Sequence, residues 1–76
     1  MDNAFEKKVG NKIKKLREAN GYTQEQFSAK LQVCGCDITR SGLAKIEVGQ
    51  RHLYIDELKI IKELLETSYE ELLDIL

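Results

Sequence analysis

Apolar residues recur at spacings of three and four along the first twenty residues, which is the period of one face of an α-helix. Lysines occupy many of the positions between them. The pattern predicts an amphipathic helix that ends at Asn20-Gly21, because glycine readily adopts the left-handed conformation that closes a helix. The apolar stripe consists of Phe5, Val9, Ile13, Leu16 and Ala19.

A capping pattern follows at once and predicts a second helix from Thr23 to about Val33. The Thr23 hydroxyl can accept from the backbone N–H of Gln26, while the Gln26 side chain can reach back to the backbone of Thr23. Tyr22 and Phe27 flank this capping box at the positions of a hydrophobic staple. The start of the second helix is therefore marked twice, by polar and by apolar residues.

The same signals return after segment 34–37, whose glycine and aspartate predict a turn. Thr39 is a second capping residue, and Ile38 and Leu43 occupy the staple positions around it. The sequence thus predicts a third helix at residues 39–48, closed by the glycine that follows.

Carboxylates mark the remaining helices. Asp56 and Glu57 fall in a first turn, where negative charge is favourable against the helix dipole, and predict a fourth helix to about Glu66. Ser68 and Glu71 form another capping box and begin a short fifth helix. With 76 residues and no proline, we expect one all-α domain of five helices, since a domain usually needs about 50 to 200 residues.

The net charge of −1 is unusual for a protein that binds nucleic acid, which normally presents a basic surface. The average hides a split between the two parts of the chain. Residues 1–51 hold ten Lys and Arg against six Asp and Glu, a net +4, whereas residues 52–76 hold two lysines against seven acids, a net −5. This asymmetry indicates one half that faces a polyanion and one that faces away from it.

Several classes of protein do not fit the chain. No run of about 18 apolar residues could span a membrane, and the N-terminus lacks the apolar core of a signal peptide, so we expect a cytoplasmic protein without a membrane partner. Cys34 and Cys36 are expected to be free thiols, because two ligands cannot make a four-coordinate zinc site. His52 is the one histidine, and no catalytic arrangement surrounds it. We expect neither an enzyme nor a metal or other cofactor.

The third helix has a cationic side with small residues opposite its apolar side. Leu43 and Ile46 lie on the apolar side at 100 degrees per residue. A helix in the major groove needs small residues where backbones approach and hydrogen-bonding side chains at base edges. Gly42 costs about 1 kcal/mol relative to alanine, and the residues leave open whether a first turn tolerates it or DNA approaches closely there. The candidate donors to bases are Arg40, Ser41 and Lys45.

Taken together, these segments resemble the helix-turn-helix family of the Cro and phage-repressor type, often called the Xre family. The resemblance is carried by NGYTQEQFS at 20–28 and RSGLAKIEVGQR at 40–51, and it continues through 56–58 and 68–73. It implies a compact lambda-repressor-like domain over residues 1–76, in which the second helix braces the DNA backbone and the third reads bases.

The resemblance also implies roles for individual residues. Gln24 matches a position that touches phosphate, and Thr23 and Gln24 present helix-terminal amides that suit an anion. Arg17 and Glu47 match a structural salt bridge between the first and third helices. The reading positions are Arg40, Ser41, Gly42 and Lys45, and the loop that approaches the DNA backbone contains Gln50, Arg51 and His52.

Two features depart from the family pattern. The link between Leu31 and Ile38 is longer than the family's tightest turn. Gly42 stands where the family often has serine or threonine, which removes one possible contact. Sequence preference is therefore expected to depend mainly on Arg40 and Lys45.

The last two helices contain more apolar residues than a cap of 25 residues needs. Those at the end of the chain either close the core or pair with a second copy. A homodimer through the C-terminal helix would place its reading helices about 34 Å apart and predicts a pseudo-palindromic site in double-stranded DNA. The residues in question are Tyr69, Leu73, Ile75 and Leu76.

We therefore expect a sequence-specific DNA-binding transcriptional regulator, a dimeric repressor that reads the major groove with the helix at 39–48. The alternative is an antitoxin or protein-interaction module on the same fold, with DNA contact secondary. Because rows of lysines are usually solvated, only a few in the first helix, such as Lys14 or Lys15, are expected to touch phosphate.

Overall fold

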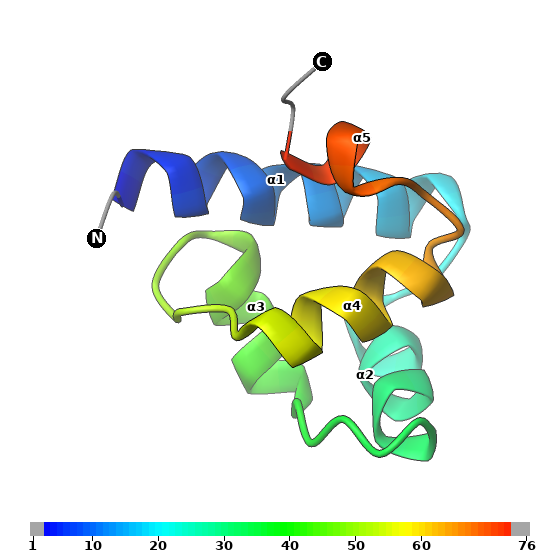
Figure 1. Ribbon diagram of the computed structural model, residues 1–76. Helices are drawn as coiled ribbons and strands as arrows, with labels where there is room; N and C mark the ends of the chain where they lie inside the picture. Colours follow the sequence, from blue (N-terminus) through cyan, green and yellow to red (C-terminus); the bar gives the residue numbers. More distant parts are fainter. Residues whose placement is uncertain (1–2, 74–76) are drawn as a thin grey trace.

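The computed structural model describes residues 3–73, and over this range it contains five helices and no strand (Figure 1). The predicted all-α, five-helix architecture is confirmed. The helices are α1 (Asn3–Ala19), α2 (Gln24–Val33), α3 (Arg40–Glu47), α4 (Ile55–Leu64) and α5 (Tyr69–Leu73).

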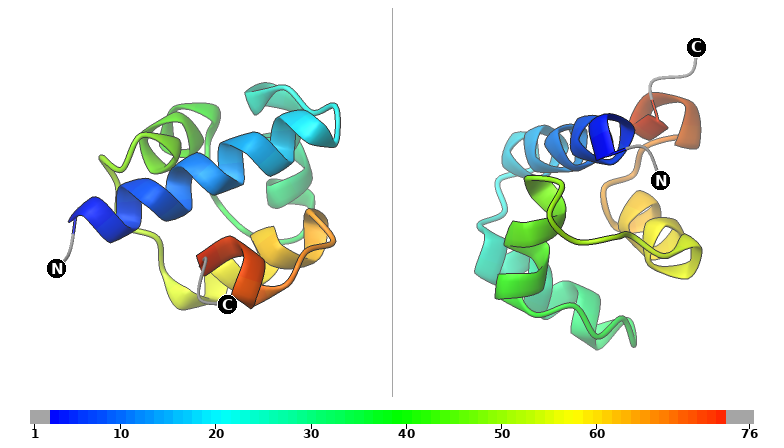
Figure 2. Two further views of the ribbon diagram at one scale, coloured as in Figure 1. Left: turned by 90° about the horizontal axis from the view of Figure 1, so that it is seen from above. Right: turned by 90° about the vertical axis from the view of Figure 1, so that its left-hand side faces the viewer.

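The helices form two groups beside the long helix α1. In the side view of Figure 2, α2 and α3 lie on one side of the molecule, and α4 and α5 lie on the other. Helix α1 packs against α3 and α5, and α2 packs against α3 and α4. The buried apolar side chains between them form the core: Val9, Ile13, Phe27, Leu31, Cys36, Ile38, Leu43, Ile46, Ile61, Leu65 and Leu72.

The predicted start of α2 is confirmed in its details. The backbone N–H of Gln26 donates to the Thr23 hydroxyl at 3.1 Å, and the N–H of Thr23 donates to Gln26 Oε1 at 2.9 Å. The rings of Tyr22 and Phe27 lie 5.8 Å apart, as a hydrophobic staple requires. Local polar and apolar signals therefore agree on where this helix begins.

Helix α3 also begins as predicted. The Thr39 hydroxyl accepts from the backbone N–H of Gly42 at 3.0 Å. Ile38 and Leu43, the staple residues on either side, are both buried in the core. The linker between α2 and α3 thus ends by inserting one side chain into the core immediately before the helix that follows.

Helices α1 to α4 end in the same backbone motif. After α1, the N–H of Tyr22 donates to the carbonyl of Arg17 at 3.1 Å, and a bond of the same type closes each of the other three. The motif needs one left-handed residue, which is Gly21 after α1 (φ 79°) but Glu66 after α4 (φ 52°). Helix α4 therefore ends at Leu64, two residues before the predicted end.

The predicted apolar stripe of α1 is right in its middle and wrong at its ends. Val9 and Ile13 are buried, whereas Phe5 and Ala19 are exposed. A helix of 17 residues is about 25 Å long. It spans nearly the whole 28 Å of the molecule, so both of its ends extend past the elements that it covers.

Backbone contact joins α1 to the end of α3. A Cβ atom on Gly10 would collide with the carbonyl oxygen of Ile46, and a Cβ on Gly49 would lie 2.9 Å from Cα of Lys7. Two glycines on opposite sides of the joint therefore let the two chain segments approach more closely than any side chain allows. The role of Gly10 could not be predicted from the sequence, because a glycine inside a helical pattern does not indicate which segment will pack against it.

Candidate nucleic-acid interface

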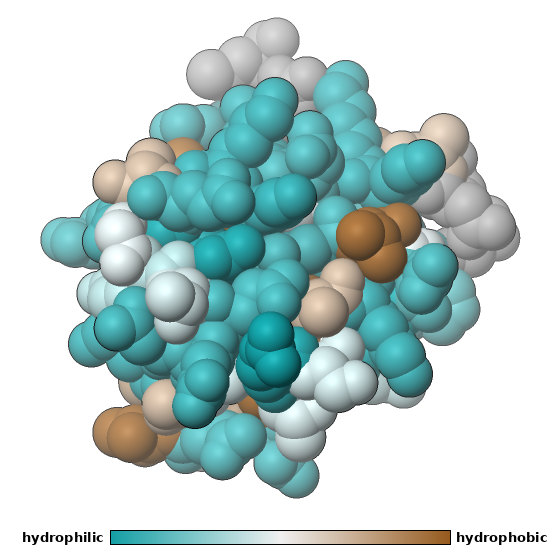
Figure 3. Space-filling view, turned by 180° about the vertical axis from the view of Figure 1, so that it is seen from behind, coloured by the Kyte–Doolittle hydropathy of each residue, from teal (hydrophilic) through white to brown (hydrophobic). Residues whose placement is uncertain are grey.

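The two sides of α3 differ as the helical period predicted. Leu43 and Glu47 are buried on the inner side, while Arg40, Ser41 and Lys45 are exposed on the outer side. Figure 3 shows the molecule from the side on which α2 and α3 lie, and hydrophilic residues cover most of it. The short helix thus presents two cations and a hydroxyl on a polar surface.

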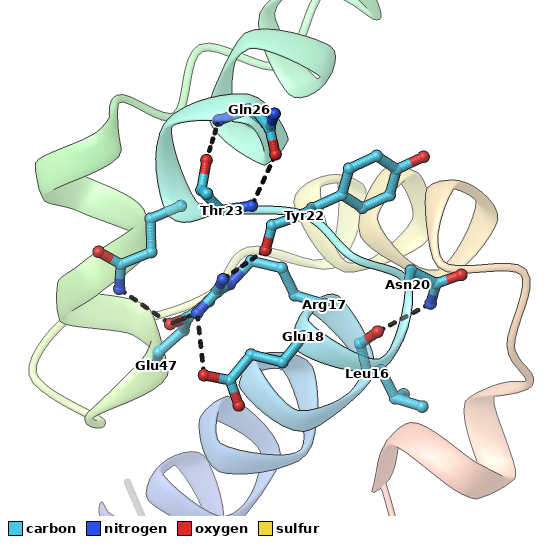
Figure 4. A network of polar contacts seen from close by, with 9 residues as sticks. Leu16, Arg17, Glu18, Asn20, Tyr22, Thr23, Gln26 and Glu47 are labelled. Carbon is cyan, nitrogen blue, oxygen red and sulfur yellow. Dashed lines mark hydrogen bonds and ion pairs between the residues drawn. The ribbon is translucent and has the colours of Figure 1, made fainter.

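A buried ion pair fixes the other side of α3 to α1. Arg17 Nε donates to Glu47 Oε2 at 2.7 Å and Arg17 Nη2 donates to Glu47 Oε1 at 3.1 Å, with side chains only 6% and 1% exposed (Figure 4). Arg17 also donates to the carbonyl of Tyr22 at 2.7 Å. These bonds satisfy the carboxylate, which would otherwise be unfavourable at a helix C-terminus.

The start of α2 is committed to internal bonds to a greater extent than predicted. Gln24 Nε2 donates to Glu47 Oε1 at 3.0 Å, so the side chain expected at a phosphate takes part in the ion-pair network. The N–H of Thr23, expected to be available to an anion, instead donates to Gln26 within the capping box. The prediction was wrong for that amide, because a capping box consumes the donor that it caps.

Gly42 lies in the first turn of α3, and the protein leaves room for a methyl group there. The nearest atoms to an added Cβ are Thr39 Oγ1 at 3.4 Å, Ile38 Cγ2 at 3.6 Å and Arg51 Nε at 3.8 Å. These are ordinary contact distances. Packing inside this chain therefore does not require glycine at this position.

The loop after α3 is tied to the scaffold. Arg51 forms a two-pronged ion pair with Glu57, both N···O distances being 3.0 Å, and it also donates to the carbonyl of His52. The Glu57 carboxylate raises the pKa of Arg51, and the Arg51 guanidinium lowers the pKa of Glu57. Arg51 was predicted to face the DNA backbone, but the structure places it half-buried against α4.

The other two loop residues differ from each other. His52 Nδ1 lies 2.9 Å from a carboxylate oxygen of Glu6 in α1, although the His52 side chain is 60% exposed. Gln50 has an exposed side chain, and its backbone N–H closes α3 on the carbonyl of Lys45. Of the three loop residues predicted to approach DNA, Gln50 is therefore the one whose side chain is exposed and does not lie beside a carboxylate.

The charge split along the sequence becomes a separation in space. Residues 52–73 form α4 and α5, which lie across the molecule from α2 and α3 (Figure 2). Glu57, at the start of α4, is the exception, because it lies near the first turn of α3 and is paired there with Arg51. The exposed charges of α3 itself are the cations Arg40 and Lys45.

A second exposed surface lies on the α4 and α5 side. Tyr54 is 65% and Ile55 is 86% exposed at the start of α4. A shallow groove beside them is lined by Ile55, Leu58, Tyr69 and Leu73 among others. Tyr69 and Leu73 were predicted either to close the core or to pair with a second copy; Tyr69 is exposed, and Leu73 is partly buried against the core. Tyr54 and Ile55 were not predicted, although two adjacent large apolar residues mark the start of this helix. Ile75 and Leu76 lie outside the described residues.

Both cysteines are free, as predicted. Cys34 is exposed, and Cys36 is buried in the turn before α3. Burial and the nearby carboxylates raise the pKa of the Cys36 thiol. The thiol therefore acts as a small apolar side chain in the core.

Comparison with known families gives one result. The sequence model of the helix-turn-helix family matches residues 13–72 of the chain, which includes all of α2, α3 and α4. No curated protein and no solved structure matches. Among the described residues, no helix has the length and apolar character needed to cross a membrane.

Proposed function

Because this chain belongs to the helix-turn-helix family of DNA-binding regulators, we propose that α3 enters the major groove and reads bases through Arg40, Ser41 and Lys45. The observation that supports this most directly is the division of α3 into a buried side and an exposed cationic side. Leu43 and Ile46 hold the helix in the core, and Glu47 holds its end against α1.

The dimensions and charges of α3 suit a major groove. An α-helix with its side chains is about 10 to 12 Å across, which fits the groove's width of about 12 Å. Arg40 in the first turn can donate two parallel bonds to the O6 and N7 of a guanine. Lys45, more than one turn further along, supplies a second cation, and Ser41 supplies a hydroxyl that can donate or accept.

Arg40→Ala tests the reading role. We expect a loss of about 1 to 3 kcal/mol in specific affinity and a relaxed choice of base at one position. Selection of bound sites from a random DNA pool supplies the site, and titration on selected and scrambled duplexes supplies the affinities. Lys12→Ala, which removes a cation on the side of α1 that borders Leu72 of α5, is the control. An equal loss on both duplexes would reduce Arg40 to a phosphate contact.

We further propose that the chain acts as a homodimer. The exposed Tyr54 and Ile55 and the groove beside Tyr69 and Leu73 support this, because large apolar groups gathered on one surface mark an interface. A two-fold axis would place two copies of α3 about 34 Å apart on a pseudo-palindromic site. As a repressor, the dimer would act by occupying that site and excluding other proteins.

Ile55→Asp tests the dimer without endangering the fold. Ile55 is the first residue of α4, where a carboxylate is favourable against the helix dipole, and its side chain is largely exposed. Sedimentation should show a dimer for the parent protein and a monomer for the variant. A parent protein that sediments as a monomer at all concentrations, free and on DNA, would exclude the dimer.

The same apolar surface supports a second candidate, an antitoxin or interaction module that holds another protein there. Salt separates the two functions. DNA binding through several phosphates weakens steeply as salt rises, by about 0.9 log units per contact per tenfold change. Binding of a protein to Tyr54 and Ile55 would respond weakly to salt and would be lost in Ile55→Asp.

A further inference from the structure

A polar row runs along α1 on the side that borders the end of α3. Lys7, Asn11 and Lys14 follow one another at spacings of four and three, so they share one face of the helix. All three side chains are exposed. Together with Val48, they line a shallow groove between α1 and the C-terminal end of α3.

The row is held rigidly relative to the reading helix. Gly49 would place a Cβ only 2.9 Å from both Cα and Cβ of Lys7, and Gly10 lies directly on the carbonyl of Ile46. Since α1 and α3 meet backbone to backbone, the position of α3 on DNA also sets the position of Lys7 and Lys14.

Among the described residues, the carboxylate that lines this groove belongs to Glu47, and its charge is balanced within the protein. Glu47 is 1% exposed at its side chain and accepts from Arg17 and Gln24. Glu18, one turn beyond Lys14, lies 4.0 Å from the Arg17 guanidinium, which offsets part of its charge. The groove, which Lys8 also lines, therefore presents three lysines and an amide with little opposing charge.

We propose that the α1 row, defined as Lys7, Asn11 and Lys14, binds phosphates of the DNA backbone beside the groove that α3 occupies. The inference rests on the proposed function and extends the contact surface from α3 to α1. A helix in the major groove has a phosphate backbone along each side, and lysine and asparagine are ordinary donors to phosphate oxygens. These contacts position the domain and add affinity that is independent of base sequence.

Paired charge variants on the same helix test the α1 row. The test variant is Lys7→Gln with Lys14→Gln. The matched control is Lys12→Gln with Lys15→Gln, which removes the same charge from the side of α1 that borders Leu72 of α5. Lys15 was a candidate phosphate contact from the sequence, but it does not line the groove between α1 and α3. Affinity for a random-sequence duplex is measured over a series of salt concentrations, and thermal unfolding is followed for each protein.

The test variant should lower the slope of log affinity against log salt by about 1.8, or 0.9 for each lost phosphate contact. The control should leave the slope unchanged. Equal changes in both variants, or none in either, would overturn the α1 contact. A lower melting temperature with an unchanged slope would do the same, since it would mean that the lysines only stabilise the negative end of α3.

The two proposals fail separately. If the parent protein binds no duplex at any salt concentration, the proposed function fails and the α1 contact fails with it. If the parent protein binds and Arg40→Ala alters base preference, but the test variant keeps the parental slope, the α1 contact alone is overturned.

Discussion

Two arginine–carboxylate pairs flank the loop after α3; each is held by two hydrogen bonds, through Nε and Nη2 in Arg17 and through Nη1 and Nη2 in Arg51, and their surroundings differ. Arg17 and Glu47 join α1 to α3 with side chains 6% and 1% exposed. Arg51 and Glu57 join the loop to α4 with side chains 29% and 12% exposed. The first pair is dry and the second is within reach of water.

The difference in exposure separates a rigid contact between helices from one that can rearrange. A buried pair whose partner is removed leaves an uncompensated charge in the interior, whereas a pair near water can be rehydrated. The α1–α3 joint also contains Gly10 and Gly49, where backbones meet without side chains. Helix α3 is therefore fixed firmly on the α1 side and more loosely on the loop side.

Glu47→Gln should have the largest effect. It leaves the Arg17 guanidinium buried without a counter-charge, at a cost of about 3 to 5 kcal/mol. A core this small supplies a net stability of roughly the same size, so the variant should be largely unfolded at room temperature. Urea unfolding followed by circular dichroism measures the change.

A double variant sharpens this result. Replacing Arg17 and Glu47 together with methionine removes both charges, and the double change should cost less than Glu47→Gln alone. The free energy of unfolding of Glu47→Gln could instead lie within about 1 kcal/mol of that of the parent protein. The Arg17–Glu47 pair would then be no better shielded from water than an exposed surface pair, and the contrast between the two pairs would fail.

Gly10→Ala should come next, at about 1 to 3 kcal/mol of destabilisation, because the added methyl group collides with the backbone carbonyl of Ile46. Gly42→Ala is the matched control, since its Cβ would make only ordinary contacts. There the change should be neutral or stabilising by up to about 1 kcal/mol, from helix propensity. Denaturant midpoints compare the two. A reversed order would mean that α1 and α3 are not in backbone contact in solution.

Gly42→Ala has a second reading on DNA. If DNA approaches α3 closely at its first turn, the variant should bind a selected site more weakly although its stability is not lowered. Unaltered affinity would show that glycine is merely tolerated at this position.

Glu57→Gln should have a smaller effect, about 0.2 to 1 kcal/mol, since its pair is partly solvated. Unfolding free energies of the two proteins at neutral pH measure it. A loss as large as that of Glu47→Gln would remove the distinction between the two joints.

The pH dependence of stability tests the same comparison between the two pairs, and it has the smallest expected effect. Arg51 holds the pKa of Glu57 below its ordinary value of 4.5. The stabilisation from this pair is therefore complete above pH 4.5 and is lost as the pH falls through the lowered value. The stability difference between the parent protein and Glu57→Gln should shrink in that acid range. A difference that stays constant with pH would exclude a contribution from the carboxylate charge.

Local signals account for much of what could be predicted. Thr23 and Thr39 cap their helices as their neighbours indicate, because a capping box and a staple involve residues only a few positions apart. The two sides of α3 follow from the helical period alone. The end of α4 was predicted at about Glu66, two residues beyond its observed end at Leu64. Glu66 adopts the left-handed conformation that closes the helix, and a glutamate at this position gives no local signal for that conformation.

The candidate site shows where local signals stop. Arg51 reads from the sequence as one more cation in a loop, and only the folded chain brings Glu57 against it. Gln24 reads as a helix-terminal donor, and only the approach of α3 supplies Glu47 as its acceptor. A side chain that could bind several partners binds the one that the tertiary fold places nearest to it.

The amino-acid sequence alone determines the five helices, their capped starts, the inner and outer sides of α3 and the charge split between the two parts of the chain. Each of these features depends on residues that are neighbours along the chain. Only the tertiary structure decides which cationic side chains remain exposed. It also decides that Gly10 is where α1 contacts α3, and that Tyr54 and Ile55 lie outside the core. Those outcomes depend on segments that meet across the fold, and the distances between such segments are not encoded in any local pattern.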